Sequence, residues 1–230
     1  MMMREQRWYK KRIMNSSYDL WLALYKLDLL KDSPPFWWPN VGEFEVLVGA
    51  ILTQQTKWEN VQKALENLQS ANLLSLESLA SEPIMIVEES IKPSGYYRKK
   101  AKTLSLLCQA ILEDYGDFEC FKAHVNREWL LSQKGIGLES ADAILCYACE
   151  REVMVVDNYT NKLLKSLNYE FESYDALQEW LVLGIEMHFD KISEYYKEEI
   201  SLFTIFSRLH GKIVQYSRDR PKEKGKIVLD

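Results

Sequence analysis

Apolar residues recur along most of the chain at the three- and four-residue spacing of amphipathic helices. This pattern predicts helices over 17–30, 43–55, 58–68, 96–116, 126–133, 139–150, 158–167, 174–189 and 193–214. Only the segment EVMVV, at 152–156, is rich in the β-branched residues typical of a strand, and it is short. The chain contains no internal repeat and no low-complexity linker. We therefore expect an all-α fold.

Two features between the predicted helices invite a chemical interpretation. Gly135 and Gly137 form the turn KGIG, where glycine permits positive φ and close approach to a ligand. The free N–H groups of the following helix could bind an anion, here a DNA phosphate, although an ordinary helix–helix turn also explains the glycines. Asp157 precedes the predicted helix 158–167, where an N-cap is its simplest role.

Composition is compatible with a helical protein of one large or two small domains. The 230 residues are 47% hydrophobic with only nine glycines and six prolines, which favours a real core built from helices. A net charge of −5 argues against a protein that coats nucleic acid by bulk charge, but basic clusters occur at 8–12, 96–102 and 217–226.

The chain also gives no sign of secretion or membrane insertion. The apolar run 46–52 is too short to span a bilayer, and the basic N-terminal residues precede no apolar signal segment. Together with only four cysteines, this predicts a reduced cytoplasmic protein.

Four ordered segments resemble the helix-hairpin-helix DNA glycosylase superfamily, which includes endonuclease III. They are the TQQT turn after 44–52, the GYYRKKAK helix start at 95–102, the KGIG hairpin, and VVDNYTNKLL at 155–164. The resemblance implies two helical domains with the active site in the cleft between them. It implies a six-helix barrel-like domain at 37–152, with the hairpin at about 126–149, and a second domain from 1–36 and 153–230 that carries the catalytic aspartate.

The resemblance also assigns roles to individual residues. The target nucleotide is flipped out of duplex DNA, because its glycosidic bond is inaccessible within the stack. Asp157 then stabilises the cationic sugar that forms as the base leaves, and orients the attacking water. Gly135, Gly137 and the adjacent Lys134 hold a phosphate, and Gln55 fills the gap in the duplex.

Departures from the family pattern narrow the activity. Strand-cutting members carry a Schiff-base lysine where this chain has Glu139, which predicts a monofunctional glycosylase that leaves an abasic site. The adenine mismatch enzyme uses a glutamate where this chain has Ala50. No cysteine follows Cys149, so we expect no iron–sulfur cluster.

The tryptophans of the segment PPFWWPN and Trp58 are explained by core packing or an interdomain seal, and it is the family resemblance that favours a role in substrate binding. Trp37 and Trp38 are adjacent, so in an extended segment their rings point in opposite directions, one toward the core and one toward a cavity. A cationic alkylated purine such as 3-methyladenine is attracted to such rings and is already a good leaving group. The chain thus resembles the cluster-free 3-methyladenine DNA glycosylases of bacteria, which places these residues at the base pocket: Trp37, Trp38, Pro39, Trp58, Lys212 and Arg218.

Several expectations concern cofactors and partners. Cys146 and Cys149 form a C-x-x-C inside a predicted helix, and two core-facing cysteines explain it better than a metal site. His124, His188 and His210 lack ligand spacing, so we expect neither metal nor other cofactor. A buried Lys212 would be costly unless neutralised, for instance by carbamylation. The expected partner is damaged double-stranded DNA, bound by a monomer in the bacterial cytoplasm, at the nucleoid.

Three alternatives stay open at this stage. The chain could excise another base, such as mismatched thymine or an oxidised base. It could be a non-catalytic helix-hairpin-helix DNA-binding protein, which explains the glycines and basic clusters but neither Asp157 nor the tryptophans. A purely structural helical scaffold explains the fewest of these features.

Overall fold

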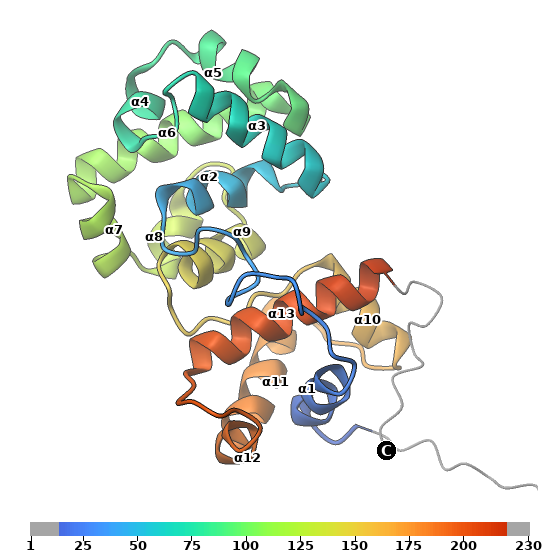
Figure 1. Cartoon of the computed structure of the whole chain (residues 1–230). Coiled ribbons are helices and arrows are strands. Elements are labelled where there is room, and N and C mark those ends of the chain that lie inside the picture. The colour runs from blue at the N-terminus through green and yellow to red at the C-terminus, as the bar shows by residue number, and fades with distance from the viewer. Residues whose placement is uncertain (1–13, 220–230) are drawn as a thin grey trace, which may run out of the picture.

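The computed structural model describes residues 14–219, and these residues form helices and connecting turns without a β-strand (Figure 1). The basic cluster at 8–12 and the part of the C-terminal cluster beyond 219 lie outside the described residues. Within 14–219, no helix combines the length and apolar character needed to cross a bilayer.

The helices form two groups. Helix α13 belongs to the second group and also contacts η2 of the first (Figure 1). The first group contains α2 (Phe44–Leu52), α3 (Trp58–Ser70), α4 (Leu76–Ser81), α5 (Ile84–Ser90), the 3₁₀ turn η1 (Lys92–Ser94), α6 (Tyr97–Tyr115), α7 (Phe118–His124), α8 (Arg127–Ser132), α9 (Leu138–Ala143) and the π-helix η2 (Ile144–Ala148). The second contains α1 (Ser17–Tyr25), α10 (Asn158–Ser166), α11 (Tyr174–Glu186), α12 (Phe189–Ser193) and α13 (Leu202–Asp219).

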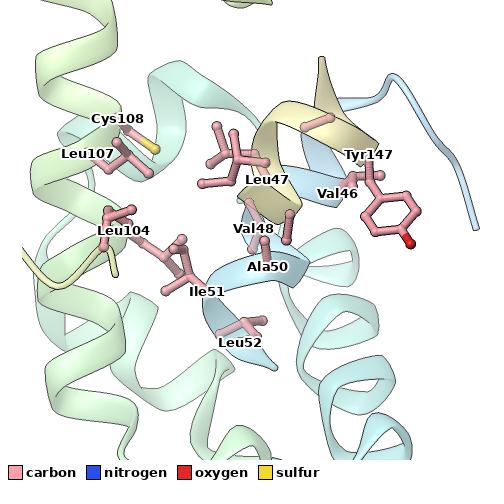
Figure 2. Packing of buried hydrophobic residues seen from close by; sticks show 14 of the residues in the cluster. Val46, Leu47, Val48, Ala50, Ile51, Leu52, Leu104, Leu107, Cys108 and Tyr147 are labelled. Carbon is pink, nitrogen blue, oxygen red and sulfur yellow. The ribbon is translucent and has the colours of Figure 1, made fainter. Parts of the chain in front are cut away.

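Each group surrounds its own hydrophobic cluster. In the first, α2 is buried along nearly its whole length and packs against α6, with Ile51 next to Leu104 (Figure 2). The second is built on Trp21 of α1 and Phe206 of α13. The domain boundaries given above stay a prediction, but the core itself falls into these two clusters.

A buried carboxylate joins the two groups. Asp142 of α9 is fully buried and accepts two hydrogen bonds from the guanidinium of Arg127, at 2.8 and 3.2 Å. Gln178 of α11 donates to the same carboxylate and to the carbonyl of Met154. Because an unpaired buried charge is expensive, these partners fix the hairpin against the second group.

The predicted strand at 152–156 is wrong, because these residues are extended but pair with no other segment in the described chain. Val155 packs into the first cluster, whereas Met154 and Val156 pack into the second. The continuous apolar run therefore reflects an extended linker whose side chains alternate between two cores, not a strand of a sheet.

The single helix predicted over 193–214 is also wrong. Helix α12 ends at Ser193 and α13 begins only at Leu202. In between, Tyr195 and Tyr196 pack against Trp21 of α1, and the charged residues that follow offer no apolar face for a helix to bury.

Smaller differences concern short helices and helix ends. Helices α4, α5 and α7 were not predicted, because six or seven residues display less than two full turns of the helical period, and the equally short α8 was predicted beside the glycine turn. Helix α1 ends at Tyr25, five residues before its predicted end, and the helix predicted over 139–150 is α9 followed by η2.

The hairpin turn requires glycine at position 135. Gly135 has φ +93°, and a Cβ atom there would lie 2.4 Å from Oγ1 of Thr103 on α6. Gly137 has φ −104° and open space where a side chain would sit. The first glycine is needed by the fold, whereas the second leaves room above the start of α9.

We expect Gly135→Ala to lower the free energy of unfolding by about 2 kcal/mol or more, through left-handed strain and contact with Thr103. Gly137→Ser is the matched control, and because serine is a good N-cap it should change that free energy by only about 0.5 kcal/mol. Urea unfolding of both variants measures this, and equal destabilisation would contradict the distinction.

Candidate active site

Asp157 lies at the N-terminus of α10 and is oriented by capping it. Its Oδ1 accepts a hydrogen bond from the backbone N–H of Thr160 at 2.7 Å and another from the Thr160 hydroxyl at 2.8 Å. The predicted cap is therefore confirmed. Because Oδ1 is engaged in this way, the second oxygen, Oδ2, is left for other chemistry.

Oδ2 of Asp157 faces a histidine. The Nε2 atom of His210, on α13, lies 3.6 Å away, and the Asp157 side chain is 12% exposed. Burial alone would raise the pKa of Asp157, but His210 and the two hydrogen bonds from Thr160 outweigh it and lower that pKa. The carboxylate is thus ionised, which an electrostatic catalyst requires.

A second carboxyl group accompanies Asp157. Glu139, near the start of α9, lines the same hollow of about 330 Å³, together with Val156, Asn158, Asn161, Phe171, Ser173, Tyr174 and Leu177. Desolvation, followed by the charge of Asp157, raises the pKa of Glu139, while His210 opposes the rise. The pKa values of the two carboxyl groups are therefore shifted in opposite directions, although Glu139 itself is exposed at the surface of the hollow.

The hairpin presents unused backbone donors. The N–H groups of Gly135 and Gly137 have no acceptor in the described part of the chain, and Lys134 beside them is exposed. Such N–H groups ahead of a helix suit an anion. The structure thus places all three residues predicted to hold a phosphate on one exposed turn.

The TQQT turn lies against the hairpin because of Gln54. Its side-chain amide donates to the carbonyl of Gly135 at 3.1 Å and to Oγ of Ser140 at 2.9 Å. Gln55 follows with φ +54°, an uncommon left-handed conformation for a residue other than glycine, and its side chain is exposed. The predicted plug residue therefore projects from the surface beside the predicted phosphate site.

The three predicted pocket tryptophans form one cluster. The rings of Trp37 and Trp38 lie 6.0 Å apart, and those of Trp38 and Trp58 lie 5.6 Å apart, both edge to face. The extended arrangement expected for Trp37 and Trp38 is wrong, because Trp37 has φ +71°, and both rings contact Tyr147. The bend between prolines turns the two side chains toward the same neighbour.

Trp37 connects this cluster to Asp157. Its ring lies 5.0 Å from that of His210, edge to face. Helix α13 passes so close that a Cβ atom on Gly211 would lie 2.3 Å from Cγ of Trp37. Pro39 and Trp58 line a separate hollow of about 380 Å³, which shares no lining residue with the hollow at Asp157.

Lys212 and Arg218 have different surroundings. Lys212 is buried with its ammonium 4.8 Å from the ring centre of Tyr25, and burial lowers its pKa to about 8. Arg218 is exposed and pairs with Asp219 at 3.0 Å. No ring contact or hydrogen bond in the described residues joins either side chain to the tryptophans, so their place in the base pocket stays a prediction.

The cysteines of the C-x-x-C pair are both buried, and burial raises their pKa values, that of Cys149 to about 12. Cys146 belongs to the π-helix and Cys149 follows it, so both are core residues. Within 14–219, no three histidine, cysteine or carboxylate side chains are arranged to hold a metal ion.

Three residues of the site were missed by sequence reasoning: His210, Tyr147 and Gln54. His210 and Tyr147 come from helices far apart in the chain, and no local pattern links them to Asp157. Gln54 lies in the TQQT turn, which the sequence analysis identified, but the functional role in that turn was assigned to its neighbour Gln55.

Known proteins resemble this chain along most of its length. The sequence model of the HhH-GPD superfamily base excision DNA repair proteins matches residues 48–179. A protein of Methanocaldococcus jannaschii named a DNA repair glycosylase is 36% identical over 215 residues, covering 91% of this chain and 92% of that one.

Solved structures show the same likeness. A 3-methyladenine DNA glycosylase of H. pylori, MagIII, bound to 1,N6-ethenoadenine, is 47% identical with a TM-score of 0.87, over 89% of this chain and 98% of that one. A complex of endonuclease III with DNA, at 20% identity, shares the fold with a TM-score of 0.63, over 89% of this chain and 87% of that one. The chain belongs to the HhH-GPD superfamily of base excision DNA repair proteins.

Proposed function

We propose that the protein is a monofunctional DNA glycosylase that removes alkylated purines, 3-methyladenine above all, and leaves an abasic site. The observation that carries the proposal is the Asp157 carboxylate, held ionised at a helix terminus and linked through His210 to the ring of Trp37. The similarity to a 3-methyladenine glycosylase over nearly the whole chain supports the substrate class.

The reaction follows from what each group offers. The hairpin N–H groups and Lys134 bind a phosphate of the DNA backbone. Gln55 fills the gap that the flipped nucleotide leaves in the duplex. As the N-glycosidic bond breaks, positive charge develops on the deoxyribose, and the ionised Asp157 stabilises it. Water then adds to the sugar carbon and completes hydrolysis.

We infer the substrate class from the chemistry of the tryptophan cluster and from the similarity to a 3-methyladenine glycosylase. An alkylated purine carries positive charge and is stabilised over the electron-rich faces of tryptophans, by about 0.5–2 kcal/mol for each good contact. Such a base leaves without protonation by a general acid, which fits a chain that has Ala50 and not a glutamate in α2. Trp37, Trp38, Pro39 and Trp58 are the residues that we assign to this pocket.

Lys212 and Arg218 complete the proposed pocket from α13. With its pKa lowered to about 8, Lys212 has an appreciable neutral fraction near neutral pH. The neutral amine is the form that adds to carbon dioxide, with loss of one proton, to give a carbamate. Mass spectrometry of the intact protein under bicarbonate detects that modification.

The proposed reaction uses no cofactor and no covalent intermediate. The position of the Schiff-base lysine is taken by Glu139, whose carboxyl cannot form an imine. No cysteine follows Cys149 to hold an iron–sulfur cluster.

We expect Asp157→Asn to reduce release of 3-methyladenine from alkylated DNA by about 100-fold or more, because the neutral amide no longer stabilises the cationic sugar. Asparagine caps helices as well as aspartate does, so the free energy of unfolding and the DNA affinity should stay close to wild type. The assay follows 3-methyladenine and 7-methylguanine by chromatography. Full activity of Asp157→Asn would show that Asp157 is not catalytic. Wild-type protein that binds DNA but releases neither base would be a DNA-binding module and not a glycosylase of alkylated purines.

Borohydride should trap no covalent complex between the protein and alkylated or abasic DNA, since no lysine occupies the position of Glu139. Endonuclease III, which has been trapped covalently on DNA, serves as the positive control. A stable adduct on a denaturing gel would show that another amine performs strand cleavage, and peptide mapping would identify it.

We expect Trp37→Leu to lower kcat/KM for 3-methyladenine by about tenfold, whereas Trp37→Phe keeps an aromatic face and loses only about threefold. Trp180→Leu is the matched control, because Trp180 packs against Tyr169 and Phe171 in the second cluster. Equal losses for Trp37→Leu and Trp180→Leu would indicate a general packing effect and not base recognition.

A further inference from the structure

His210 is a buried histidine that the reaction described above does not yet use. Its side chain is only 6% exposed, and its Nε2 atom lies 3.6 Å from Oδ2 of Asp157. Among the described residues this nitrogen has no hydrogen-bond partner. A buried polar atom without a partner is costly, so its place directly opposite a carboxylate calls for an explanation.

The other ring nitrogen of His210 is fixed by a phenol. Nδ1 lies 2.8 Å from the hydroxyl of Tyr147, which is fully buried in η2 and also lies 3.2 Å from the carbonyl of Ser207. Burial, and then the nearby Cys146 and Asp157, raise the pKa of Tyr147 well above its usual value. The phenol therefore keeps its single proton, and only one of its two neighbours receives it.

The neighbouring carboxylate decides the tautomer. If Tyr147 donates to Nδ1, the neutral imidazole carries its hydrogen on Nε2 and points it at Asp157. The opposite tautomer would direct a lone pair at an anion, which is repulsive. The 2.8 Å contact between the Tyr147 hydroxyl and Nδ1 allows that donation, and the repulsion between a lone pair and the carboxylate selects the Nε2–H form.

We propose that His210 is a positioning residue that donates its Nε2–H to Oδ2 of Asp157, with its tautomer fixed by Tyr147. Thr160 fixes the other carboxylate oxygen, so the pair of contacts would lock the carboxylate in one rotamer. The 3.6 Å separation is long for a hydrogen bond, as is common for catalytic contacts in the absence of substrate, so the proposed bond forms only once DNA is bound. The inference rests on the function proposed above and deepens it.

The device has a pH signature. The titratable groups that face His210 are the carboxyl groups of Asp157 and Glu139 and the phenol of Tyr147. Burial would raise the pKa of Asp157, and the interaction with His210, together with the hydrogen bonds from Thr160, lowers it. Because activity requires the ionised form, it is lost as pH falls through this pKa. Removing the donor raises the pKa, so the acidic limb of the rate profile should move to higher pH.

Two variants of His210 separate a donor role from packing. His210→Gln retains an N–H group near the Nε2 position, whereas His210→Phe keeps a ring without a donor. We expect His210→Phe to slow single-turnover release of 3-methyladenine by about tenfold or more, and His210→Gln by only about threefold. DNA affinity should change little in either, and the acidic limb should move only in His210→Phe.

Further variants guard against misfolding and non-specific effects. Tyr147→Phe removes one oxygen and should slow base release a few-fold, since the His210 tautomer is no longer fixed. His188→Phe is the matched control, because His188 stacks on Tyr18 and bonds to the Gly184 carbonyl in the second group. It should leave the rate and the pH profile unchanged. Thermal unfolding identifies any variant whose loss of rate reflects loss of structure.

The outcomes are distinguishable from failure of the proposed function. Loss of base release in Asp157→Asn, with full rate and an unshifted profile in folded His210→Phe, would overturn only the role of His210. The same holds if folded His210→Gln and His210→Phe lose equal activity with unshifted profiles, since a packing role predicts that result. Should His210→Phe not fold, Tyr147→Phe carries the test. A wild-type rate of base release in folded Tyr147→Phe overturns the proposed tautomer lock.

Discussion

The hydrogen bonds from Thr160 to Oδ1 of Asp157 are the interaction on which the rest of the site depends. They cap the N-terminus of α10, and they also leave Oδ2 pointing toward His210. A cap residue is constrained by the first turn of its helix, so its side chain has little freedom. One carboxylate therefore starts a helix and presents a fixed negative charge, and the cap that appears to be its whole role is the means by which its other oxygen is oriented.

That orientation is useful only because two separately packed groups of helices meet around it. Asp142 accepts from Arg127 and Gln178, and this buried network fixes the hairpin to the second group. Residues 154–156 run between the two clusters, with successive side chains buried on opposite sides, and deliver Asp157 to the junction. Helix α13 supplies His210 there and also Gly211, whose missing side chain admits Trp37. The aromatic cluster, the histidine and the carboxylate thus come together through packing that no single segment specifies.

Features that depend on a few neighbouring residues were predicted correctly from the sequence. The cap at Asp157, the positive φ at Gly135 and the buried cysteines follow from residue type and immediate neighbours, and the structure agrees. The same reasoning failed for 152–156 and for 193–214. In the first, burial on two sides imitated a strand, and in the second, tyrosines that pack on α1 imitated the apolar face of a helix. The extended arrangement expected at Trp37 was wrong as well, because its backbone is left-handed and its ring packs against Gly211 of α13.

The sequence by itself determined the helical class, the superfamily and the residues whose chemistry is written in motifs: the glycine hairpin, the TQQT turn and the aspartate before α10. These are set by backbone conformation and capping, which act over a few neighbouring residues. Only the tertiary structure decided that His210 faces Asp157, that Tyr147 holds the other ring nitrogen and that Lys212 packs on Tyr25. Those contacts join residues from distant helices, and their geometry is set by the packing of two cores, which no periodicity along the chain encodes.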